Sequence, residues 1–192
     1  MLLDEPTFCV RAAFLDHGTP CLGFAIEEKT RVNVWKNRLA ELGLAVGPWL
    51  KELKDAATRN APDATPVRAW WRDGKGEQER VLPLGTLKAT VLRLVPGTKI
   101  CYVTDVAFDP HNVQRITALA AGAAQLFIEC VFLDQDADHA ARKRHLTARQ
   151  AGSIAGAAGA KLVIPFHFSP RYAEREAQLR AEIEAAARAA AP

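Results

Sequence analysis

Five polar residues at or near the ends of apolar runs have side chains that bind metals or move protons. Imidazole nitrogens and carboxylate oxygens are the usual ligands of zinc and manganese, and histidine also exchanges a proton near neutral pH. Residues on separate strand ends can meet at one point, so the sequence indicates a metal site built from several strands. The residues are His17 after AAFLD, Asp105 after ICYVT, Glu129 within LFIECVF, His145 in KRHLTA and His167 just beyond LVIP.

Each of these residues also has a structural explanation. A single histidine at a strand end is usually a hydrogen-bonded structural residue, and an aspartate after a strand usually forms a turn or caps a helix. His145 directly precedes an expected helix, where it could simply cap the helix or be solvated. Residue type alone therefore leaves both explanations open.

Strands and helices are expected to alternate from residue 87 onward, after two strands within residues 7–27. This alternation is typical of a layered α/β fold, in which loops at one edge of the sheet carry the chemistry. The expected strands are KATVLRLV, KICYVTD, AQLFIECVF and KLVIPFH. The expected helices are PHNVQRITALAAG, closed by Gly122, the polar DADHAARKRH, the small-residue TARQAGSIAGAAGA, opened by Thr147, and an Ala/Glu/Arg helix from Arg171 to the end.

Residues 28–86 differ in composition from the rest of the chain. They combine prolines, glycines and mixed charges with Trp49, Trp70 and Trp71, and two short helices are expected on either side of Gly47. The segment shows no strand periodicity, so we expect an inserted, comparatively mobile arm outside the sheet layers.

Composition sets the class of protein. The 192 residues suffice for one domain, and 49% apolar and 24% charged residues are ordinary for a globular protein. A net charge of +3 does not by itself indicate a nucleic-acid-binding protein, although Arg142, Lys143 and Arg144 cluster directly before His145. The four scattered cysteines form no C-x-x-C pair, and the sequence has no membrane-spanning or signal pattern. We therefore expect a cytoplasmic protein without disulfides.

Four segments, in this order, resemble the second part of ribonuclease Z, the tRNA 3′-end endonuclease: LDHGTPCLGFAIEE, KICYVTD, KRHLTARQAGSIA and IPFHFSPRY. The resemblance covers nearly the whole chain, is weak in the arm, and is strongest from Asp105 to Tyr172. It implies the metallo-β-lactamase fold, an αββα sandwich with a two-metal site. The expected cofactor is zinc, with manganese as an alternative, and the expected partner is a tRNA precursor or another RNA.

The resemblance assigns a role to each candidate residue. His17, Asp105 and His167 match metal ligands, and Asp105 matches the aspartate that bridges the two metals. His145 matches the histidine of the family's HST motif, here HLT, and is an expected catalytic residue near the scissile phosphate. Glu129 is the second expected catalytic residue. It lies where the family has HEAT, although the histidine of that motif is missing here.

The resemblance also indicates substrate-binding residues. Gly47 and Pro48 resemble the GP element of the family arm that grips the tRNA elbow. The remaining expected substrate contacts are Arg144, Thr147 and Arg171, which lie near the proposed site in the sequence motifs.

One departure from the family pattern limits these expectations. The principal metal motif, H-x-H-x-D-H, is absent, and His111, His139, His145 and His167 each stand alone. We therefore expect residues 1–192 to be the C-terminal portion of a metallo-β-lactamase-like domain, incomplete and inactive alone. Two alternatives stay open: a hydrolase of the same fold acting on another substrate, and a non-catalytic half-domain that binds RNA or a partner. A homodimer is also left open.

Overall fold

The structure, a computed structural model, describes residues 1–74 and 76–191 and divides the chain into two compact units. Unit 1 comprises Met1–Lys29 and Thr98–Pro192, and unit 2 comprises Thr30–Gly97. Unit 2 thus differs at both ends from residues 28–86, over which an arm is expected. The position and mobility of that arm stay predictions.

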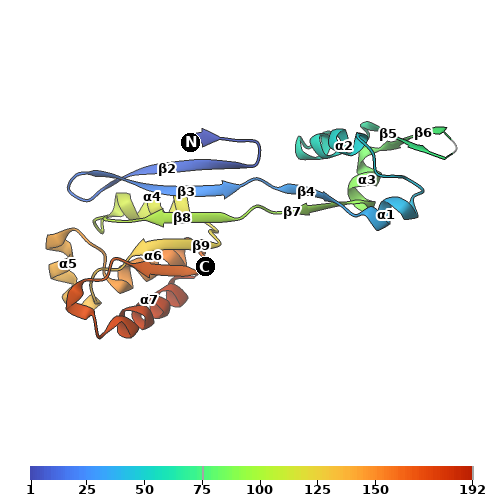
Figure 1. The fold of residues 1–192 in the computed structure, drawn as a ribbon. Helices are drawn as coiled ribbons and strands as arrows, with labels where there is room; N and C mark the ends of the chain where they lie inside the picture. Colours follow the sequence, from blue (N-terminus) through green and yellow to red (C-terminus); the bar gives the residue numbers. More distant parts are fainter. Residues whose placement is uncertain (75, 192) are drawn as a thin grey trace. The chain divides into compact units, whose positions relative to one another are not determined.

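Unit 1 contains a six-stranded sheet with the strand order β1-β2-β3-β8-β9-β10, most of which can be followed in Figure 1. β3 pairs antiparallel with β2 and with β8, whereas β8, β9 and β10 are parallel to one another. β2 therefore runs in the same direction as β8, β9 and β10, and all four strands end at one edge. The bounds are β1 Leu3–Asp4, β2 Phe8–Asp16, β3 Pro20–Glu28, β8 Lys99–Val103, β9 Gln125–Glu129 and β10 Val163–Phe166.

One face of this sheet is packed against helices. Buried side chains from alternate strand positions, among them Leu15, Ala25, Cys101 and Ile128, join those of the helices in one hydrophobic core. This arrangement confirms the mixed α/β class expected from the alternating pattern. The helices of unit 1 are α4 Pro110–Ala120, α5 Ala137–Lys143, α6 Ala148–Ala157 and α7 Glu176–Ala190, with 3-10 turns at Asp134–Asp136 and Pro170–Tyr172.

The intervening strand positions form an exposed apolar sheet face. Phe24 lies opposite Tyr102, and Ile26 lies opposite Ile100, so these side chains are cross-strand neighbours. Phe14, on β2, is 71% exposed. A contiguous apolar surface of this kind usually marks an interaction site.

Unit 2 has its own core, built around the fully buried Trp49. Its helices are α1 Lys36–Glu41, α2 Trp49–Thr58 and α3 Leu84–Thr90, and its strands pair as β4 Arg31–Val34 with β7 Leu92–Val95 and as β5 Pro66–Asp73 with β6 Gly76–Pro83. The segment therefore contains strands, although its sequence shows no strand periodicity. β6 has no buried residue and no clear apolar face, which explains the absent periodicity in that part of the segment.

Several predicted boundaries also need correction. The run KATVLRLV is not one strand, because its first three residues end α3 and only Leu92–Val95 pair with β4. β9 ends at Glu129, three residues before the end of the predicted strand. The last helix begins at Glu176, after the separate turn at Pro170–Tyr172.

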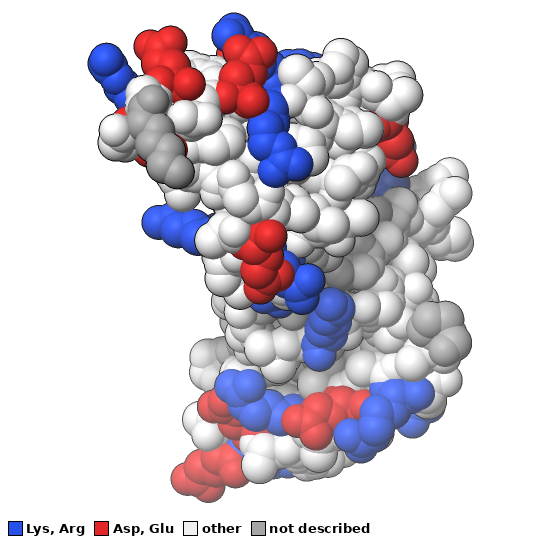
Figure 2. All heavy atoms as spheres, turned by 90° about the vertical axis from the view of Figure 1, so that its right-hand side faces the viewer, with Lys and Arg blue, Asp and Glu red and all other residues white. Residues whose placement is uncertain are grey.

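The surface carries charges of both signs. On the face shown in Figure 2, lysine and arginine side chains lie interspersed with aspartate and glutamate, in keeping with the net charge of +3. Among the described residues, no helix combines the length and apolar composition needed to cross a membrane.

The packing of α6 against α7 depends on two glycines. A Cβ atom would lie 2.3 Å from the Ile183 carbonyl oxygen at Gly152 and 2.3 Å from the Ala187 carbonyl oxygen at Gly156. Both distances are far below van der Waals contact, so only glycine allows the two helix backbones to approach this closely.

We therefore expect Gly156→Ala to lower the free energy of unfolding by about 1–3 kcal/mol, the usual range for overpacking. Urea denaturation followed by circular dichroism measures this change. Gly74→Ala is the matched control, because no atom lies within 4 Å of its added methyl group. Equal stability of Gly156→Ala and the unmodified chain would show that the helices are not in close contact.

Candidate metal centre

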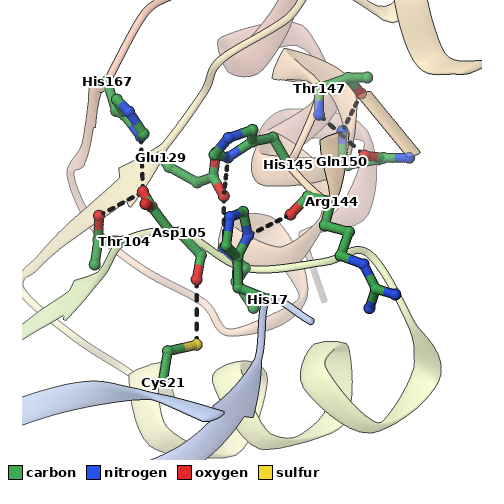
Figure 3. A network of polar contacts seen from close by, with 11 residues as sticks. His17, Cys21, Thr104, Asp105, Glu129, Arg144, His145, Thr147, Gln150 and His167 are labelled. Carbon is green, nitrogen blue, oxygen red and sulfur yellow. Dashed lines mark hydrogen bonds and ion pairs between the residues drawn. The ribbon is translucent and has the colours of Figure 1, made fainter. Parts of the chain in front are cut away.

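The five polar residues singled out in the sequence meet at the common edge of four strands (Figure 3). His17, Asp105 and His167 follow β2, β8 and β10, and Glu129 is the last residue of β9. His145 reaches the same edge because the segment before α6 pairs with the chain after β9. Phe132 and Thr147 form a parallel bridge there.

Asp105, His145 and His167 form a group of potential metal ligands. One ligand atom from each lies within 4.8 Å of the other two. His167 Nδ1 is 2.9 Å from Asp105 Oδ1, and the Thr104 hydroxyl donates to the same oxygen at 3.1 Å. Partial burial acts to raise the pKa of Asp105, but the charge of His167 and the bond from Thr104 outweigh it and lower the pKa. Asp105 is therefore ionised at neutral pH, as a metal ligand must be.

Glu129 is buried and contacts His145 directly. Its Oε2 lies 3.0 Å from His145 Nδ1, while its Oε1 accepts a hydrogen bond of 2.7 Å from the Val106 amide. The bond to Glu129 raises the pKa of His145 against the opposing effect of burial. The carboxylate thus holds the imidazole by one nitrogen and leaves Nε2 for chemistry.

His17 lies beside this group. Its ring centroid is 4.6 Å from that of His145, and its Nδ1 is 2.8 Å from the Arg144 carbonyl oxygen. The ligand atoms within 4.8 Å of one another come from His145, Asp105 and His167 and do not include His17. By distance, His145 belongs to the group of potential metal ligands and His17 does not, whereas the sequence motifs indicate a ligand role for His17 and a catalytic role for His145.

The donor set fits zinc or manganese, since it consists of imidazole nitrogens and a carboxylate. Zinc is almost always bound by four ligands in structural sites, and by three protein ligands with one open position in catalytic sites. His17, Asp105 and His167, with His145 nearby, could complete one such shell at most. A second metal ion would need ligands that these residues do not provide.

The residues expected to bind substrate lie in different environments. Thr147 is buried, and its hydroxyl accepts from the Gln150 amide as the N-cap of α6 and contacts Asp134, so it has no surface that a substrate can reach. Gly47 and Pro48 lie at the start of α2, where a Cβ at Gly47 would be 2.7 Å from the Trp70 carbonyl oxygen. Their positions are explained by local packing, and substrate binding by them stays a prediction.

Arg171 lines a hollow of about 540 Å³ beside His145 and His167. His139 and Lys143 line it as well; Lys143 belongs to the basic cluster before His145, whereas the sequence indicated no role for His139. They are four residues apart on α5, and this spacing places both on one face of a helix. Their spacing in the sequence could therefore have indicated that both line the hollow, if the position of α5 next to His145 had been known.

Comparisons with known proteins relate this chain to ribonuclease Z. No family model matches the chain. It is 36% identical to ribonuclease Z of Deinococcus radiodurans over 185 residues, covering 96% of this chain and 51% of that protein. It is 35% identical to ribonuclease Z of Thermobifida fusca over 183 residues, covering 95% of this chain and 50% of that protein. The predicted relationship is therefore confirmed in sequence, and the chain spans about half the length of the curated relatives it matches.

Two solved structures are also similar. The metallo-β-lactamase-fold protein YhfI from Bacillus subtilis matches with a TM-score of 0.48 and 14% identity, over 96% of this chain and 45% of that one. The short form of human tRNase Z matches with a TM-score of 0.44 and 20% identity, over 89% of this chain and 40% of that one.

The buried carboxylate of Glu129 leads to a stability prediction. Glu129→Ala is expected to lower the free energy of unfolding by about 1–3 kcal/mol, because the Val106 amide and His145 Nδ1 lose this acceptor inside the protein. Glu129→Gln should lose less, since its amide oxygen can still accept from Val106. Urea titration of both variants checks this order. A Glu129→Ala protein as stable as the unmodified chain would contradict it.

Proposed function

We propose that this chain forms about half of a metal-dependent phosphodiester hydrolase of the ribonuclease Z type, whose substrate is a tRNA precursor. The observation that carries the proposal is the meeting of His17, Asp105, Glu129, His145 and His167 at one sheet edge. These are the residues whose sequence motifs resemble those of ribonuclease Z. Sequence similarity to proteins of that name over nearly the whole chain supports the proposal.

The proposed roles follow from the contacts of each residue. His17, Asp105 and His167 hold the metal ions, which would be zinc or, alternatively, manganese. When bound, the ions would supply a hydroxide near neutral pH and neutralise charge on the phosphoryl oxygens. Glu129 positions His145 through Nδ1, and His145 gives a proton to the leaving 3′ oxygen from Nε2. The raised pKa of His145 keeps that proton available near neutral pH.

The RNA would be held largely by contacts to its phosphates. Arg171 and Lys143 border the hollow beside the histidines, and Arg144 directly precedes His145. Such contacts position a nucleic acid without reading its sequence. Gly47 and Pro48 would contact the tRNA elbow, in keeping with the family arm that they resemble. The cytoplasm is the proposed location, since tRNA precursors are the proposed substrate.

Completion of the site requires ligands from outside these residues, because the chain lacks H-x-H-x-D-H. The exposed apolar sheet face offers the surface for a polypeptide that supplies them. An exposed apolar sheet face fits the inner face of a second sheet, as in other sheet-on-sheet packings. A second copy of this chain could cover the same face but would bring no such motif.

The first expected outcome concerns the chain alone. We expect it to retain little zinc or manganese after dialysis and not to cleave a tRNA precursor, since half of a ligand shell leaves a metal open to competing ligands. Metal analysis and a precursor-tRNA cleavage assay measure both properties. Two tightly held metals with full activity would mean that the chain carries a complete site of another design.

The second expected outcome concerns reconstitution with a fragment that carries H-x-H-x-D-H. In the reconstituted enzyme, His167→Ala should lose metal, whereas His145→Ala should retain metal and lose turnover. Loss of metal in His145→Ala would instead make His145 a ligand, in agreement with its place among the potential ligand atoms. If the fragment binds but restores neither metal nor cleavage, the chain is better explained as a non-catalytic half-domain.

A further inference from the structure

A backbone carbonyl contacts the ring of His17 at the sheet edge. The Arg144 carbonyl oxygen is 2.8 Å from His17 Nδ1, although 127 residues separate the two in sequence. A carbonyl oxygen can only accept, so Nδ1 must carry the hydrogen. In the neutral ring this leaves the lone pair on Nε2, and only an unprotonated nitrogen binds a metal ion. The contact therefore selects one tautomer of His17.

The carbonyl faces His17 because Arg144 has a left-handed backbone conformation. Its φ of 61° and ψ of 35° end α5. In a continuing helix, the Arg144 carbonyl would accept from the amide of Ala148, but that amide bonds to the Phe132 carbonyl at 2.8 Å. The left-handed region is uncommon for residues other than glycine and persists only where the surroundings enforce it.

The side chain of Arg144 has a different environment from its carbonyl. Figure 3 shows it leading away from the histidines, while the carbonyl faces His17. A Cβ added at Gly18 would lie 2.7 Å from Arg144 Cδ, so the arginine stem lies directly against the glycine that follows His17. Gly18 itself has a φ of 85°, which a residue with a side chain rarely adopts.

The other two histidines are held in the same manner. His145 is bound through Nδ1 by Glu129, and His167 through Nδ1 by Asp105. All three rings thus have Nδ1 engaged by an oxygen atom, which leaves Nε2 of each available. Metal-binding histidines are usually oriented by such a contact to the second ring nitrogen.

We infer that the backbone carbonyl of Arg144 is a positioning group for His17, which fixes the Nδ1–H tautomer and presents Nε2 for metal binding. The inference rests on the proposed metal-binding role of His17. Arg144 thus positions His17 through its left-handed backbone and not through its side chain. The sequence, in contrast, indicated a substrate contact for this residue.

Nuclear magnetic resonance of the chain tests the tautomer directly. Long-range 15N–1H spectra at about pH 8, above the ordinary pKa of histidine, should show His17 protonated at Nδ1. Arg144→Gly should keep this tautomer, because glycine adopts the left-handed conformation readily. Arg144→Val should lose it, because a β-branched residue resists that conformation. Arg142→Val, at an exposed helix position nearby, is the control for the loss of charge and the added valine.

Zinc affinity, measured by competition with a chelating dye, gives a second result. Arg144→Val should bind zinc about 10–100-fold more weakly than the unmodified chain, which is the usual effect of removing such a contact. Arg144→Gly should bind zinc with the affinity of the unmodified chain. A His17 ring protonated at Nε2 in the unmodified chain, or one unchanged in a folded Arg144→Val, would overturn the inference. If Arg144→Val does not fold, the spectra of the unmodified chain and Arg144→Gly decide. If no protein binds zinc, the result agrees with the incomplete ligand shell expected of the chain alone, and the tautomer of His17 decides the inference by itself. The proposed function is tested separately by reconstitution.

Discussion

The common direction of β2, β8, β9 and β10 is the constraint on which the candidate site depends. β3 pairs antiparallel with β2 on one side and with β8 on the other, so β2 shares the direction of the parallel strands although it is hairpin-connected to β3. His17 therefore lies at the same edge as Asp105, Glu129 and His167. The register of the hairpin is equally important. Shifting β2 by one residue against β3 would move every β2 side chain to the other face of the sheet.

In unit 1, both the set of potential metal ligands and the covering of the sheet are incomplete. The potential metal ligands at the sheet edge are too few for two metal ions, and one face of the same sheet exposes apolar side chains such as Phe14 and Tyr102. A single partner with a second sheet and further ligands would satisfy both. The local contacts of the histidines do not depend on that partner, because each ring is held by an oxygen atom of this chain.

The sequence was most informative where strands bury one or both faces. β2, β8, β9 and β10 contain recognisable apolar runs, and His17, Asp105, Glu129 and His167 lie at their ends, whereas His145 was located by the motif before α6. β6 in unit 2 was missed because a strand without buried residues needs no apolar face. β5 was missed although Val67 and Ala69 lie buried at alternate positions, because exposed and charged residues surround this short pattern. Trp49 stands in a segment without a core-like pattern in its sequence, yet it is the largest fully buried side chain of that unit, since its neighbours are brought together only by the fold.

Other features of the site were beyond sequence-based reasoning. The left-handed conformation of Arg144 occurs at a residue type that does not favour it, so no composition rule indicates it. The contact with His17 joins segments 127 residues apart and depends on the complete strand order. Likewise, Thr147 was correctly placed at the start of a helix, but its burial became visible only in the structure.

The central claim is that the histidines and Asp105 at this edge bind a metal ion. Crystals of the chain grown with zinc at millimolar concentration, measured at the zinc absorption edge, test it directly. The account predicts an anomalous difference peak among Asp105, His167 and the Nε2 atoms of the neighbouring histidines. Zinc bound only elsewhere on the chain, with the edge free of metal, would contradict it.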